Sequence, residues 1–151
     1  MKIIAAVSEN GVIGAGDGLP WDVPEEYQQY RDTVRGATVI FGRRSYEIFG
    51  EDLSDSRLIV VTSQPEVEGA VAADSLETAL AMAELDPGEV WVAGGASLYE
   101  QAIPLASRMR LSTIKGRYEG DVYFPEWDRS RWREALCEEH DRFTLREWAR
   151  A

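Results

Sequence analysis

Cysteine and histidine are almost absent from this chain of 151 residues. Cys137 is the only cysteine, which excludes an intramolecular disulfide and a cysteine-based zinc site. His140 is the only histidine, and it lies beside Asp141 in a predicted turn, where a surface position is expected. These counts exclude Ser-His-Asp and Cys-His catalysis, and we expect no bound metal.

Long apolar runs are also missing. No segment approaches the roughly 20 apolar residues of a membrane-spanning helix. The apolar run at residues 3–7 is too short for an export signal. We therefore expect a cytoplasmic monomer with no membrane partner. The length suits one domain over residues 1–151, which would bury roughly 68–70% of its unfolded surface.

Positive charge is in deficit, because 16 Lys and Arg residues face 27 Asp and Glu residues and leave a net charge of −11. Such a surface repels phosphate backbones, so no nucleic-acid partner is expected. Lys2 and Lys115 are the only lysines. An acidic, lysine-poor surface suits a salty cytoplasm, where screening makes high net charge tolerable. A GC-rich genome with an acidic bias would give the same composition, so a halophilic host is one of two hypotheses.

Strand and helix patterns alternate through most of the chain. Apolar runs predict strands at residues 2–8, 37–41, 58–61, 69–73, 89–93 and 108–115. Helices are predicted at residues 24–35, 43–49, 76–85 and 96–102, and Ser75 is expected to cap the third. Residues 132–139 and 143–148 suit an antiparallel pair. The pattern predicts an α/β fold with a largely parallel sheet and an antiparallel edge.

The first predicted helix carries an acid on its apolar side. On a helical wheel, Val23, Glu26, Tyr27, Tyr30 and Val34 fall within an arc of about 100°. The opposite side carries residues 25, 28, 29 and 32. Glu26 is therefore either a first-turn acid stabilised by the helix dipole or a carboxylate held between aromatic walls to bind a ligand with N–H donors. We interpret Glu25 as a plain first-turn acid.

Two predicted strands end in segments suited to phosphate. In open α/β sheets, ligands bind outside the carboxyl ends of parallel strands. Gly42, Arg43, Arg44 and Ser45 follow one strand, and a second glycine-rich helix start follows another at residues 94–97. Taken singly, the arginines could serve solubility and the glycine pair could form a tight turn. Together they suggest a site for a dinucleotide. Ser63, which follows another predicted strand, would lie on the same rim of the sheet, formed by the carboxyl ends of its strands.

The connection at residues 10–22 is glycine-rich and too long for an ordinary strand-to-helix link, so it is a candidate mobile lid. Its glycines do not follow the GxGxxG spacing of a Rossmann fingerprint.

Several blocks in order carry a family resemblance. They lie at residues 3–6, 12–14, 19–24 (LPWDVP) with Glu26, 39–43, 94–95 with Leu98 and Tyr99, and 119–125 (EGDVYFP). In this order they resemble dihydrofolate reductase from residue 1 to about 127, and more loosely beyond. The resemblance implies a central mixed, mostly parallel eight-stranded sheet flanked by about four helices. It also implies NADPH-dependent reduction of 7,8-dihydrofolate to tetrahydrofolate, which supports one-carbon and thymidylate metabolism.

The resemblance also implies roles for individual residues. Glu26 would hold the pterin and accept a hydrogen bond from Thr113, while Leu19 and Trp21 would close over the nicotinamide near Tyr99. The substrate walls would be Ile4, Ala6, Tyr27, Tyr30, Phe49 and the carbonyl of Ala93. The cofactor residues would be Ala6, Ile13, Gly14, Gly42, Arg43, Arg44, Ser45, Ser63, Gly94, Gly95, Ala96, Ser97, Leu98 and Tyr99. The Gly94-Gly95 peptide is expected to be cis.

One departure from the family concerns the substrate's glutamate tail. Family members usually place an arginine just after a Leu-Pro pair to bind it, and Ser56 stands in that place here. Two alternatives follow: Arg57, one position later, clamps the tail, or the tail is only weakly held. Two alternatives to the reductase stay open: a riboflavin-pathway pyrimidine reductase of the same fold, and a non-catalytic module that binds a dinucleotide or a folate.

Overall fold

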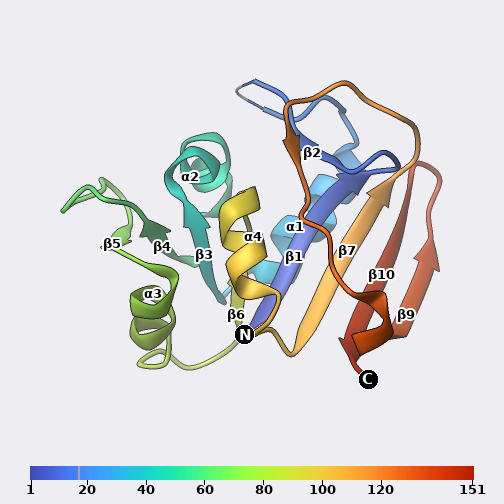
Figure 1. Cartoon of the computed structure of the whole chain (residues 1–151). Coiled ribbons are helices and arrows are strands. Elements are labelled where there is room, and N and C mark those ends of the chain that lie inside the picture. The colour runs from blue at the N-terminus through green and yellow to red at the C-terminus, as the bar shows by residue number, and fades with distance from the viewer. Residues whose placement is uncertain (17) are drawn as a thin grey trace.

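An eight-stranded sheet organises the computed structural model, which describes residues 1–16 and 18–151. Asp17, within the predicted lid, lies outside the described residues. The strand order is β5-β4-β3-β6-β1-β7-β10-β9 (Figure 1). The strands are β1 Lys2–Ser8, β3 Thr38–Gly42, β4 Arg57–Val61, β5 Val71–Ala73, β6 Val90–Val92, β7 Arg108–Ile114, β9 Trp132–Glu139 and β10 Phe143–Arg150.

Strand direction confirms the predicted sheet. All neighbours from β5 to β7 pair in parallel. Strand β10 then runs antiparallel to both β7 and β9. The antiparallel hairpin therefore forms one edge of a mostly parallel sheet, as the chain pattern indicated.

A second, two-stranded ladder was not predicted. Strand β2 Val12–Gly14 pairs antiparallel with β8 Val122–Tyr123 and anchors the start of the predicted lid. The Asp121 N–H donates to the Gly14 carbonyl at 3.2 Å. A Cβ at Gly120 would lie 2.4 Å from Val12 Cγ1 and 2.6 Å from the Gly14 oxygen, so this close approach requires glycine. Lid mobility stays a prediction.

Within the described part of the chain, four helices flank the sheet: α1 Pro24–Val34, α2 Arg43–Phe49, α3 Leu76–Ala83 and α4 Ala96–Ala102. Short 3-10 turns occupy η1 Gly50–Leu53 and η2 Arg129–Arg131. Pro24 begins α1, where its missing N–H costs nothing. The Ser75 hydroxyl caps α3 by accepting the Thr78 N–H at 3.0 Å. Among the described residues, no helix is long and apolar enough to cross a membrane.

The helices divide between the two faces of the sheet. One core joins α1 to Val39, Phe41 and Val60 of β3 and β4. Tyr46 and Phe49 of α2 pack against this core. The other core joins α3 and α4 to Ile3 and Ile40. Figure 1 shows α4 in front of the sheet and α1 behind it.

This division creates a crevice at the carboxyl ends of β1 and β6. The chain leaves β1 towards α1 on one face, whereas it leaves neighbouring β6 towards α4 on the other face. Ligands of open α/β sheets bind at such a switch point.

Candidate active site

A cavity of about 270 Å³ opens at this switch point. Its walls come from β1, the lid, α1, α2, the glycine turn after β6, and β8. The lining residues are Ile4, Ala5, Ala6, Ile13, Gly14, Gly16, Gly18, Leu19, Glu26, Tyr27, Tyr30, Arg44, Ser45, Ile48, Phe49, Ala93, Gly94, Gly95, Ala96, Tyr99 and Val122. Sixteen residues proposed from the sequence are among them.

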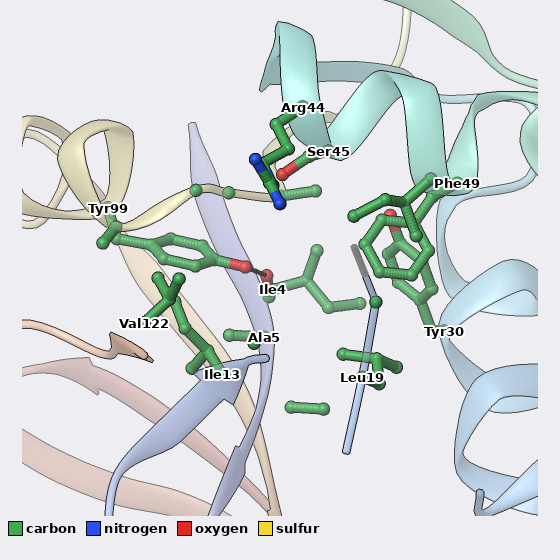
Figure 2. Close-up of a pocket in the computed structure, with 18 of the residues that line it drawn as sticks. Ile4, Ala5, Ile13, Leu19, Tyr30, Arg44, Ser45, Phe49, Tyr99 and Val122 are labelled. Atoms are coloured by element: carbon green, nitrogen blue, oxygen red, sulfur yellow. Dashed lines mark hydrogen bonds between the residues drawn. The ribbon is translucent and has the colours of Figure 1, made fainter. Parts of the chain in front are cut away.

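The cavity has an aromatic wall on each side. Figure 2 shows Tyr99 on one side and Phe49 with Tyr30 on the other. The Tyr99 hydroxyl donates to the Ile4 carbonyl at 2.8 Å, which fixes its ring against β1. Among the described residues, the buried Tyr30 hydroxyl has no hydrogen-bond partner. These walls suit a flat ligand.

Glu26 is buried at the edge of this cavity. The residue is 4% exposed, and burial raises the pKa of its carboxyl above the ordinary value of 4.5. The Gln29 amide Nε2 donates to Glu26 Oε1 at 3.1 Å. Hydrogen bonds from Gln29 and Ser112 lower the pKa, as does the charge of Arg110, but burial has the larger effect.

The neighbouring acid, Glu25, has a different environment. It lies on the outer face of α1 and accepts two hydrogen bonds from the Arg142 guanidinium, at 3.0 and 3.1 Å. Those bonds hold the pKa of the Glu25 carboxyl below its usual value. The two acids therefore divide as the helical wheel suggested: Glu25 on the surface and Glu26 inside.

Two sequence predictions about the surroundings of Glu26 are wrong. The residue of β7 that hydrogen-bonds with Glu26 is Ser112, whereas Thr113 lines a separate groove on the opposite face of the sheet. Successive side chains of a strand point to opposite faces, so an error of one position changes the face. Gln29, assigned to the outer side of α1, instead turns towards β7 and contacts Ser112 Oγ at 3.3 Å.

The predicted tail clamp is also wrong. Arg57 begins β4, forms an ion pair with Asp86 and lines a surface hollow with Thr38 and Pro87. Ser56 donates to the Val34 carbonyl at 2.7 Å. The amino end of β4 thus points Arg57 away from the cavity, which lies at the carboxyl ends of the strands.

The phosphate rim is only partly as predicted. Arg44 and Ser45 of α2 line the cavity, and Figure 2 shows the Arg44 guanidinium pointing into it. Arg43 instead pairs with Glu47 of its own helix at 3.0 Å. Four other proposed residues, Gly42, Ser63, Ser97 and Leu98, are not among the lining residues: Ser63 and Ser97 are exposed and Leu98 is in the core.

The glycine turn after β6 is shaped for close approach. The peptide bond between Gly94 and Gly95 is cis, as predicted, and Gly94 has φ +113°. A Cβ there would lie 3.2 Å from Ser45 Oγ and 3.3 Å from the Tyr99 hydroxyl. The Gly42 N–H donates to the Gly94 carbonyl at 2.9 Å and ties the two strand ends together.

The two lid residues predicted to be catalytic lie in different places. Leu19 lines the cavity (Figure 2). Trp21 is 8% exposed and packs in a small core with Val12 and Phe143. Its ring contacts that of Tyr118 edge-on, with 5.6 Å between the ring centroids. Both lid residues line an adjoining groove of about 590 Å³ that also includes Glu26 and Arg31.

Sequence reasoning missed five lining residues: Ala5, Gly16, Gly18, Ile48 and Val122. Ile48 follows Ser45 by three positions on α2, so a helical wheel of that segment would have placed it on the same face. Val122 reaches the cavity through the β2–β8 ladder, for which the sequence carried no periodic signal.

Among the described residues, no group of three or more His, Cys, Asp or Glu side chains could hold a metal ion. The chemistry of the cavity is that of a buried carboxylate between aromatic walls, next to a rim with backbone amides and a guanidinium. The fold and this cavity together define a class: α/β proteins in which a dinucleotide site adjoins a pocket for a flat heterocycle.

Comparison with known proteins agrees with that class and identifies one family within it. A sequence model of the family "Dihydrofolate reductase" matches residues 1–147. The dihydrofolate reductase of Neisseria gonorrhoeae is 41% identical over 138 residues, covering 89% of this chain and 85% of the relative. A dihydrofolate reductase of Haloferax volcanii is 36% identical over 154 residues, covering 95% of this chain and 79% of the relative.

A solved structure agrees as well. Dihydrofolate reductase from Enterococcus faecalis, complexed with NADP(H) and RAB-propyl, superimposes with a TM-score of 0.90 at 29% identity. The match covers 99% of this chain and 95% of that one. The chain belongs to the dihydrofolate reductase family, an assignment that confirms the expected NADPH-dependent oxidoreductase activity on 7,8-dihydrofolate.

Proposed function

We propose that this dihydrofolate reductase holds the pterin ring of its substrate through Glu26. The observation that carries the proposal is a glutamate, 4% exposed as a residue, at the edge of an aromatic-walled cavity. An ionised carboxylate only accepts hydrogen bonds, so it complements the ring N–H and amino group on one edge of a pterin. The aromatic rings of Tyr30 and Phe49 would stack along the rest of the substrate.

The other half of the cavity fits the NADPH cofactor. Glycine at position 94 leaves open the space that a Cβ would fill beside Ser45 and Tyr99. Backbone amides at residues 95 and 96 would receive the pyrophosphate, and Arg44 with Ser45 would bind adenosine phosphate groups. Arg44 now donates to the Gly16 carbonyl, so phosphate binding there would be coupled to the position of the lid.

The bound cofactor supplies the hydride. The protein must hold the two rings face to face, exclude water and favour a proton on the pterin ring nitrogen. Glu26 would bind the opposite ring edge from that nitrogen, so it would polarise the pterin while water delivers the proton. Leu19 would cover the reacting rings from the lid side.

Arg31 is our proposed partner for the anionic tail of the substrate. It lines the groove that adjoins Glu26, and its Nε donates to the Asp52 carbonyl at 3.2 Å. A carboxylate in this groove would meet a guanidinium of suitable geometry.

The exposed large apolar side chains support a monomer. The four with the greatest exposure among the described residues are Val71, Leu85, Leu105 and Tyr123, and they belong to separate segments. Scattered apolar residues of this kind form no contiguous interface. We also propose a cytoplasmic location. Sedimentation at micromolar concentration tests the oligomeric state, and cell fractionation tests the location.

The test of function is loss of NADPH absorbance when dihydrofolate is added, together with inhibition by an antifolate. We expect turnover with dihydrofolate, and we expect Glu26→Gln to remove most of it at neutral pH. Turnover only with a ribosylamino-pyrimidine would support the riboflavin-pathway alternative. Binding of NADPH without any turnover would support the non-catalytic module.

A further inference from the structure

A chain of hydrogen bonds connects Glu26 to a charged pair behind it. Gln29, one helical turn after Glu26, donates from its amide nitrogen to Glu26 Oε1 at 3.1 Å and approaches Ser112 Oγ at 3.3 Å. Its amide oxygen accepts from Arg110 Nε at 3.2 Å and from Arg110 Nη2 at 3.1 Å. Arg110 Nη1 in turn donates to Glu147 Oε1 at 2.7 Å.

Arg110 determines which way the Gln29 amide points. A guanidinium has five donors and no acceptor, so it can face only the oxygen of the amide. The amide nitrogen must then face the other way, towards Glu26 and Ser112. A donor in this position suits an ionised carboxylate, which has no proton to offer in return.

Arg110, which orients the Gln29 amide, is itself held in place by Glu147. Glu147 on β10 lies opposite Arg110 on β7 in the antiparallel register. The Arg110 side chain is 20% exposed, so its bonds are less screened by water than those of a surface pair. Thr33 Oγ1 donates to the Gln29 carbonyl at 2.6 Å and adds a local contact to the helix.

We propose that Gln29 and Arg110 are positioning residues that hold the Glu26 carboxylate ionised and aimed at the cavity. Neither residue is among those that line the cavity. Their role is to offset the burial of Glu26, which by itself favours the protonated acid. The proposal rests on the proposed role of Glu26 in binding the pterin.

The other groups around Glu26 do not supply this effect. Tyr27 and Tyr30 face it from α1 and Tyr99 from α4, and burial raises the pKa of all three, so they stay neutral at physiological pH. Asp22 and Arg31 share the groove beside Glu26, where Arg31 is bonded to the Asp52 carbonyl. Arg110 is the cation whose charge lowers the pKa of Glu26.

The test measures the ionisation of Glu26 directly. Carboxyl carbon NMR of the unliganded protein would follow Glu26 across pH, with the resonance assigned by its loss in Glu26→Gln. In Gln29→Leu and in Arg110→Leu, we expect the Glu26 titration midpoint to move to higher pH. Arg110→Lys keeps a cation that can donate to Gln29, so the midpoint should return towards that of the parent protein.

Steady-state kinetics give a second measurement. We expect kcat/KM for dihydrofolate in Gln29→Leu to fall roughly tenfold below the Glu26 midpoint of the parent protein, because one charge-assisted hydrogen bond to the carboxylate is lost. The fold loss should disappear above the variant midpoint, where Glu26 is ionised in both proteins. A defect in folding alone would lower kcat/KM at every pH.

Arg108→Leu is the matched control. Arg108 lies on the same strand and approaches the same Glu147 at 3.7 Å, but it makes no hydrogen bond with Gln29. It should leave the Glu26 midpoint unchanged. An equal shift in Arg108→Leu would overturn the proposal in favour of a general charge effect. An unmoved midpoint in Gln29→Leu and Arg110→Leu would also overturn it, whereas an active Glu26→Gln would instead refute the proposed function.

Discussion

Replacing Glu26 by glutamine tests the central claim with little change in shape. Glutamine keeps the side-chain length but removes the charge and exchanges one acceptor oxygen for a donor. Each hydrogen bond from a pterin N–H would fall from a charge-assisted value to a neutral one. Over two such bonds the expected loss is about 2–4 kcal/mol, which corresponds to roughly a 30-fold to 700-fold fall in kcat/KM.

The same substitution has a predicted effect on stability. Burial raises the pKa of folded Glu26 above 4.5, its ordinary value. Its contribution to stability is therefore fully present below pH 4.5 and is lost as pH rises through the folded pKa. Glutamine does not titrate, so Glu26→Gln should gain stability relative to the parent as pH rises over that window. Urea unfolding at acid and neutral pH measures the difference.

The assay compares the hydride-transfer rate, in single turnover, across pH for both proteins. The variant should recover part of its rate at acid pH, where the substrate arrives already protonated. Glu25→Gln is the matched control, because Glu25 is the adjacent acid, lies outside and pairs with Arg142. A pH profile that Glu26→Gln leaves unchanged, or an equal loss in Glu25→Gln, would refute the assignment of Glu26.

Three further predictions concern the tail, the walls and the surface. Arg31→Ala should raise the KM for dihydrofolate by up to about fivefold, the range of an exposed ion pair. Arg57→Ala should not raise it, because Arg57 pairs with Asp86 outside the cavity. A KM raised by Arg57→Ala and unchanged by Arg31→Ala in steady-state kinetics would contradict the groove assignment. Tyr30→Phe should raise the free energy of unfolding of the unliganded protein by about 1–3 kcal/mol, because it removes a buried hydroxyl without a partner; a loss of stability in urea would indicate a partner. Thermal unfolding in KCl should show stability that rises towards molar salt. The Debye length falls from about 10 Å at 0.1 M to about 3 Å at 1 M, so repulsion within a chain of net charge −11 weakens. Equal stability at the two salt concentrations would count against a halophilic host.

Local patterns predicted the elements and the ends of the strands well. The helix at residues 43–49 has the predicted bounds, and the terminal hairpin departs only at its last strand, which extends to Arg150. The helix predicted at 76–85 ends at Ala83, because the Leu85 and Asp86 N–H groups donate to the carbonyls of Met82 and Ala83, three residues back, instead of continuing the helical pattern. Such features depend on periodicity and caps within a few residues, which a single sequence carries.

The β2–β8 ladder was missed because its strands are three and two residues long. Segments that short show no period, and their pairing joins residues more than a hundred positions apart. The Gly120 contact with Val12 depends on the same long-range pairing. It therefore became visible only in three dimensions.

The sequence by itself determined the order of strands and helices, the acid on the apolar side of α1, and the glycine turns at two strand ends, because each depends on neighbours in the chain. The tertiary structure decided which of two adjacent residues takes part in the site: Ser112 rather than Thr113 hydrogen-bonds with Glu26, and Arg44 rather than Arg43 lines the cavity. It also turned Gln29 inward to meet Arg110. The choice of Ser112 depends on strand register, where a shift of one position moves a side chain to the other face of the sheet. The other two depend on partners that are distant in sequence.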